Sequence, residues 1–247
     1  MHVVTPDEIQ GRAKENVTTE DGLSQVTHYF GERGPDNQEP SAFLVEYRPV
    51  PGGAIRPHFH KVAQFQVVIG GDGRIGKVPV PPISFQYADP STPYGPITPV
   101  DEERGIDFLT LRPVARTGLW WMPGNNHELE GVLRRNRANT VSPDKPLPSS
   151  GSERQALIEP DDDGLAGYVV RLAPGAQEVI DVPAGSAGQY HLVTRGTLVC
   201  EGRTLERMSL LFADTGERVT LTAGPDGGEV LVMQFPSGIE PQREQER

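Results

Sequence analysis

The chain has 247 residues, 36% of them hydrophobic, with 28 glycines, 24 prolines and a formal net charge of −11. This amount of glycine and proline is too high for a helical protein and favours short strands joined by tight turns. The acidic charge argues against nucleic acid or an anionic membrane as a partner, because both need a basic surface. The single cysteine, Cys200, excludes an intrachain disulfide and a zinc site built from cysteines.

The beginning of the chain lacks the apolar core of a signal peptide, and no stretch approaches the roughly 20 apolar residues of a membrane span. We therefore expect a cytoplasmic protein. Residues 1–24 are interpreted as an N-terminal segment, and the first domain is expected over residues 25–125. Within it, alternating apolar and polar residues predict a strand at 42–47, and an apolar run before Pro113 predicts a closing strand at 106–112.

Between these two strands, His58 and His60 lie one residue apart in an apolar run. Alternate side chains of a strand point to the same face, so the two imidazoles point the same way and Phe59 points to the other face. Two imidazoles directed at one point inside a barrel are suitable ligands for a metal ion. Gly52 and Gly71 suit the turns at the two ends of this strand pair.

The pattern G-x5-H-x-H-x3-Q-x6-G, over residues 52–71, resembles the first motif of the cupin superfamily, small β-barrels in which it reads G-x5-H-x-H-x3/4-E-x6-G. Gln64 stands where the family has glutamate. The second family motif, P-x-G-x-x-H, aligns with residues 89–94, so that Tyr94 replaces its histidine. The resemblance implies one bound metal ion, with iron expected and zinc, manganese or nickel as alternatives. The implied ligands are His58, His60, Gln64 and Tyr94, and Gln64 and Tyr94 are also the implied catalytic residues.

This donor set is weaker than that of the family, because the Gln64 amide is neutral and the Tyr94 phenol must lose a proton to become a strong ligand. The alternative is a pair of hydrogen-bonded histidines without a metal, in which Gln64 and Tyr94 complete a polar network. Both interpretations remain open from the sequence.

Strand parity predicts further residues that face the interior and bind substrate: Gln66, Arg48 and Arg56. An arginine near the mouth of the barrel would hold a carboxylate through two hydrogen bonds, and the alternative is a solvated arginine without a ligand. Trp120 and Trp121 follow the first barrel, and we expect them to fill the seam between two barrels rather than cover the pocket.

Residues 126–160 are polar and rich in proline and serine, so we interpret them as a linker, with a short helix at 126–137. A second barrel is expected over 161–240, followed by a disordered tail at 241–247.

The second barrel is predicted because the chain matches itself at an offset of 125 residues, with nine identical pairs between residues 45 and 89 and their partners. In this alignment Pro183 and Gly185 replace His58 and His60, so no metal site is expected in the second barrel. His191 is predicted to be a hydrogen-bonded core residue.

The sequence thus predicts an all-β protein of two tandem cupin-type double-sheet jelly-roll β-barrels. The resemblance implies a metal-binding bicupin, and in particular a dioxygenase-like oxidoreductase that acts on a small organic molecule in the first barrel. A cupin isomerase or lyase, or a non-catalytic small-molecule-binding or structural cupin, is the alternative, because a fold does not determine a reaction. A homodimer formed by sheet packing is also compatible with these features.

Overall fold

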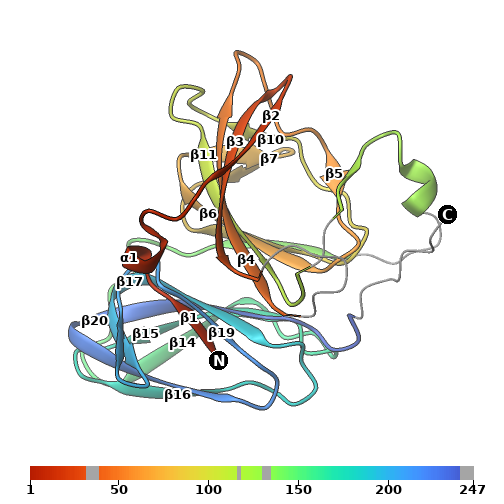
Figure 1. Cartoon of the computed structure of the whole chain (residues 1–247). Helices are drawn as coiled ribbons and strands as arrows, with labels where there is room; N and C mark the ends of the chain where they lie inside the picture. Colours follow the sequence, from red (N-terminus) through yellow and green to blue (C-terminus); the bar gives the residue numbers. More distant parts are fainter. Residues whose placement is uncertain (32–38, 116–117, 130–134, 240–247) are drawn as a thin grey trace. The chain divides into compact units, whose positions relative to one another are not determined.

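The structure is a computed structural model that describes residues 1–31, 39–115, 118–129 and 135–239. It is an all-β protein with two compact units. The first, here called barrel 1, consists mainly of Ala13–Thr140, and the second, barrel 2, combines Met1–Arg12 with Val141–Gly238. All strand pairings among the described residues are antiparallel, and each unit is a jelly-roll barrel (Figure 1). No helix in these described ranges is long and apolar enough to cross a membrane.

Barrel 1 is built from a seven-stranded sheet of order β13-β9-β6-β11-β4-β3-β2, a three-stranded sheet of order β10-β7-β8, and the strand pair β12-β5. Isolated bridges, Ile55 with Ile97 and His58 with Tyr94, connect the short strands. The strands of the large sheet are β2 (Glu15–Thr19), β3 (Gly22–Phe30), β4 (Ser41–Pro49), β6 (Gln64–Gly70), β9 (Ser84–Ala88), β11 (Ile106–Arg112) and β13 (Asn136–Thr140). The short strands are β5 (His58–Phe59), β7 (Gly73–Ile75), β8 (Val78–Val80), β10 (Ile97–Pro99) and β12 (Trp120–Trp121).

The core of barrel 1 follows from the alternation along the central strands. Val45, Phe108 and Val68 lie opposite one another on β4, β11 and β6, and all three are buried in one hydrophobic cluster. Because side chains alternate along each strand, the residues two positions away point into the same interior. This alternation determines which polar side chains point into the interior of the barrel.

Barrel 2 contains an eight-stranded sheet in which β1-β19-β17-β20-β15-β14 are neighbours, β16 pairs with β20, and β18 pairs with β17. Residues 218–222 of β20 pair with β16 and residues 228–234 pair with β15, so this one long strand serves both ends of the barrel. Its elements are β1 (His2–Val4), α1 (Pro6–Ile9), β14 (Ser152–Ile158), β15 (Ala166–Leu172), β16 (Gln177–Asp181), β17 (Gln189–Cys200), β18 (Arg203–Leu205), β19 (Leu210–Ala213) and β20 (Arg218–Gln234).

The strand pairings place the domain boundaries differently from the sequence-based expectation. Residues 1–24 are not one segment, because β1 pairs with β19 of barrel 2 whereas β2 pairs with β3 of barrel 1. Residues 126–160 are not a plain linker either, since β13 adds to the large sheet of barrel 1 and β14 adds to the sheet of barrel 2.

The helix expected at 126–137 is also wrong in extent. The described part of this segment has a 3₁₀ turn, η1 (Asn126–Leu129), and residues 136–137 already belong to β13, whereas 130–134 lie outside the described residues. The backbone of β13 is recruited by the free edge of β9, and this pairing overrides the local helical pattern. The tail at 241–247 lies outside the described residues.

Candidate functional site

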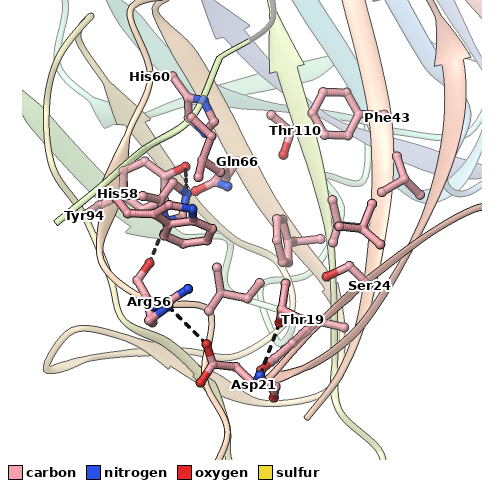
Figure 2. Close-up of a pocket in the computed structure, with 18 of the residues that line it drawn as sticks. Thr19, Asp21, Ser24, Phe43, Arg56, His58, His60, Gln66, Tyr94 and Thr110 are labelled. Atoms are coloured by element: carbon pink, nitrogen blue, oxygen red, sulfur yellow. Dashed lines mark hydrogen bonds and ion pairs between the residues drawn. The ribbon is translucent and has the colours of Figure 1, made fainter. Parts of the chain in front are cut away.

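Barrel 1 encloses a cavity of about 260 Å³ (Figure 2). Apolar side chains of the large sheet, among them Val26, Phe43, Val45 and Phe108, line one wall. Polar side chains from other elements also line the cavity, and Figure 2 shows His58, His60, Gln66 and Tyr94 gathered on one side of it. The cavity therefore combines apolar walls with one polar side, as small-molecule sites commonly do.

Both histidines of the pair are held by main-chain carbonyl groups. His58 Nδ1 lies 2.7 Å from the carbonyl oxygen of Arg56, and His60 Nδ1 lies 2.5 Å from the carbonyl oxygen of Gly118. Because a carbonyl oxygen only accepts, each Nδ1 carries a hydrogen. This is the arrangement by which proteins fix the tautomer of metal-binding histidines.

The hydroxyl group of Tyr94 is hydrogen-bonded to both His58 and Gln64. Its Oη lies 2.9 Å from His58 Nε2, and because that nitrogen accepts, the phenol donates. The Gln64 amide donates to the same Oη at 2.6 Å. Burial lowers the pKa of His58 to about 4 and raises the pKa of Tyr94, so both groups are neutral near pH 7.

The orientation of Gln64 is fixed by a buried arginine. Arg112 Nε and Nη2 donate to Gln64 Oε1 at 3.2 and 3.1 Å. A guanidinium group only donates, so the amide oxygen must face Arg112 and the amide nitrogen must face Tyr94. The structure therefore gives Gln64 no oxygen toward the imidazoles, and its predicted role as a metal ligand is not supported by this geometry.

His58, His60 and Tyr94 lie close together in barrel 1. The 2.9 Å between His58 Nε2 and Tyr94 Oη is the length of the hydrogen bond that joins them. The centroids of His58 and His60 are 5.2 Å apart. The donors gathered here are two imidazoles and a phenol oxygen, and the described residues contain no group of three or more His, Cys, Asp or Glu side chains able to hold a metal ion.

Comparison with solved structures identifies the fold. A candidate dioxygenase from Nostoc punctiforme PCC 73102 superposes with a TM-score of 0.64 at 10% identity, covering 98% of this chain and 85% of its own. Pirin YhhW from Escherichia coli, in complex with nickel(II), gives 0.59 at 14% identity over 96% and 99%. Oxalate decarboxylase from Bacillus subtilis gives 0.57 at 14% identity over 91% and 75%. The chain has a two-domain cupin fold.

No protein-family model and no curated protein matches the sequence. The recognition of a cupin from the histidine motif is confirmed at the level of the fold, and so is the all-β double-barrel architecture. Sequence identities of 10–14% carry the fold alone, so activity and ligands have to be argued from the site itself.

The three residues predicted to bind substrate lie in different places in this cupin barrel. Gln66 lines the cavity and accepts a hydrogen bond from Gln86 at 2.7 Å. Arg56 lines it too, but its guanidinium group forms ion pairs with Glu20 and Asp21 at 3.3 and 3.1 Å.

Arg48 is not among the residues that line the cavity. Its neighbour Tyr47 faces the interior, so by strand parity Arg48 faces outward, where it pairs with Asp107 at 2.6 Å. The alternation of side chains along β4, which places Arg48 on the outer face, can be read from the sequence.

Two residues of the cavity were missed or misplaced by sequence reasoning. Arg112 shares the inward face of β11 with Phe108 and Thr110, a parity that is readable from the sequence. Trp121, expected in a seam between barrels, lines the cavity, and Trp120 stacks on Phe59 with centroids 5.7 Å apart.

Barrel 2 lacks the histidine pair, and the corresponding positions are Pro183 and Gly185. His191 faces its interior, where it lies opposite Leu211 and Val232 of the core. The prediction that it is hydrogen-bonded is wrong, because neither ring nitrogen has a partner among the described residues. Burial lowers its pKa to about 3.

Proposed function

We propose that barrel 1 binds one metal ion and a small organic molecule, and that the protein is a metal-dependent enzyme of the dioxygenase-like oxidoreductase kind. The observation that carries this proposal is the pair of imidazoles whose Nδ1–H groups are both held by main-chain carbonyls while both rings line one cavity. These hydrogen bonds occupy Nδ1 of each ring and make Nε2 the nitrogen through which each histidine would bind a metal.

In this proposal His58 and His60 hold the ion through Nε2, and the Tyr94 oxygen is the third donor. Gln64 acts on Tyr94 rather than on the ion. Iron suits a set of two imidazoles and a phenol oxygen, and zinc, manganese or nickel are accommodated as well. The bound ion would supply a Lewis acid that polarises a substrate oxygen, and iron would add one-electron chemistry.

In this proposal, other side chains that line the cavity bind the substrate. Gln66 and Thr110 line the cavity beside the imidazoles and offer hydrogen bonds to a polar group of the substrate. The apolar wall holds the rest of the molecule and excludes water, which strengthens the electrostatic interactions inside. YhhW, solved in complex with nickel(II), and the candidate dioxygenase from Nostoc punctiforme are relatives in fold that make the proposal reasonable.

The test is metal analysis of the purified protein, followed by reconstitution with iron(II) or nickel(II) and measurement of bound metal by mass spectrometry. The wild type should bind one ion per chain, and His58→Ala should lose it because two strong ligands become one. His127→Ala is the matched control, since His127 is an exposed histidine beside Glu128 and away from the cavity. A wild type that takes up no metal under any of these conditions would refute the proposal.

A second candidate, a small-molecule binder without catalysis, is favoured by one observation. The chain of hydrogen bonds from Arg112 through Gln64 and Tyr94 to His58 is complete without an ion. If the metal-free protein and the His58→Ala variant bind the same small molecules with equal affinity, this candidate replaces the enzyme. Oxygen uptake by the reconstituted protein with a bound ligand separates an oxidoreductase from an isomerase or lyase.

A further inference from the structure

A short strap, defined here as residues 118–122, lies along the segment that carries the two histidines. It contains β12, which pairs with β5 so that Trp121 lies opposite His58 and Trp120 opposite Phe59. The N–H of Met122 donates to the carbonyl oxygen of Pro57 at 2.9 Å. These main-chain contacts bind the strap to the histidine segment from end to end.

The side chains of the strap continue this contact. Trp121 meets the His58 ring edge to face with centroids 5.4 Å apart, and the Arg56 guanidinium lies 5.0 Å from the centroid of the same indole. Trp120 stacks on Phe59, and the Lys61 ammonium lies 4.8 Å from its centroid. The strap therefore contacts residues on both sides of each histidine.

The strap also forms part of the cavity, which is lined by Gly118, Leu119 and Trp121. The same segment thus lines the cavity and contacts both imidazoles. The carbonyl group of Gly118 is the acceptor for His60 Nδ1.

We propose that the strap is a positioning element of the metal centre, in which the Gly118 carbonyl orients His60 and the Trp121 ring orients His58. The inference rests on the proposed function, since it assigns to the strap the orientation of the two ligands. It has a mechanical consequence: the cavity cannot open along the strap without releasing the hydrogen bond that orients His60. Entry of a ligand by this route and loosening of the ion are therefore coupled.

Gly118 offers the perturbation that tests the proposal. Its φ of +114° lies in the region that favours glycine, and a Cβ added there would lie 2.4 and 2.5 Å from two carbons of the Trp120 ring. Gly118→Ala therefore has to displace either the indole or its own carbonyl. Gly52→Ala is the matched control, because Gly52 has a φ of +77° in the same barrel and nothing within 4 Å of the added Cβ.

The first measurement is nickel affinity, by competition with a coloured chelator. Loss of an outer hydrogen-bond partner of a ligating histidine costs about 10- to 100-fold in metal affinity. Gly118→Ala should bind nickel about 10- to 100-fold more weakly than the wild type, and Gly52→Ala should match the wild type. In the double variant Gly118→Ala with Trp120→Leu, the smaller side chain should restore part of the loss. If Gly118→Ala does not fold, Trp121→Leu, which removes the ring that contacts His58, should weaken nickel binding in the same direction.

The second measurement determines the tautomer of the His60 ring in the metal-free protein. The ¹H–¹⁵N spectrum of the ring, assigned with a His60→Gln variant, should show one tautomer protonated on Nδ1 in the wild type and a mixture of tautomers in Gly118→Ala. If the wild type binds nickel and Gly118→Ala shows the same affinity and the same tautomer, this inference is overturned and the proposed function survives. A wild type that binds no metal overturns both.

Discussion

Replacing the buried histidine of barrel 2 should stabilise the protein, most of all in acid. The His191 side chain is 2% exposed among apolar core residues, and neither ring nitrogen has a partner among the described residues. A buried polar group without a hydrogen bond costs about 1–3 kcal/mol. His191→Leu fills a similar volume between Leu211 and Val232, so we expect a gain of about 1–3 kcal/mol at pH 7.

The acid dependence follows from the direction of the pKa shift. The folded-state pKa of His191 is about 3, below the ordinary value of 6.5, so the unfolded chain binds the proton more readily. The protonation of this histidine therefore adds no cost above about pH 6.5, and below that value it adds about 1.4 kcal/mol for each pH unit, down to about pH 3. At pH 4.5 the wild type should have lost about 2.7 kcal/mol from this group, and His191→Leu should have lost none of it.

The single cysteine provides a probe for the opening of barrel 2. Cys200 is the single cysteine and is buried in the same core as Leu211, whereas both tryptophans, Trp120 and Trp121, are in barrel 1. The rate at which 4,4′-dithiodipyridine modifies Cys200, measured from pH 7 to pH 4.5, reports the opening of barrel 2. Tryptophan fluorescence reports barrel 1 and should be the same for both proteins. Equal acid dependence of Cys200 modification in the wild type and His191→Leu would refute the reasoning.

Three further predictions concern barrel 1. Arg112→Met leaves the Gln64 carbonyl oxygen without its two donors, so it should lower the free energy of unfolding by about 1–3 kcal/mol, measured by urea denaturation; an unchanged midpoint would contradict the assigned orientation of Gln64. Gln64→Glu keeps an acceptor for Arg112 and adds a negative charge beside Tyr94, so nickel affinity should rise in chelator competition through the charge alone, and an unchanged or lower affinity would contradict this. Arg48→Met should leave ligand and metal binding unchanged and cost about 1 kcal/mol or less, because its ion pair with Asp107 is partly exposed.

The sequence predicts those parts of the molecule that depend on strand parity. The inward direction of Val45 and Phe108 follows from alternation, and so does the shared face of His58 and His60. The internal repeat likewise predicts two copies of one barrel. These features are local, since each depends on residues within one strand or on a regular offset.

What the sequence cannot provide are the partners that lie far away along the chain. Gln64 was predicted to be a metal ligand by resemblance, but Arg112, 48 residues later, turns its oxygen away. Trp121 was misplaced because its partner strand, β5, has only two residues and gives no pattern of its own. The domain boundaries failed for the same reason, because β13 acquires its strand geometry from β9.

The pairing of β1 with β19 has a consequence for synthesis on the ribosome. Val4 lies opposite Leu210, so β1 stays unpaired until about 200 further residues have been synthesised. In the meantime the whole of barrel 1 is translated, and its own pairings are available as soon as β13 has emerged. The nascent chain thus has one domain that can close early and another that cannot, with β1 unpaired throughout. A fragment that begins at residue 141 would lack this strand and expose the edge of β19, where a strand from another chain could pair.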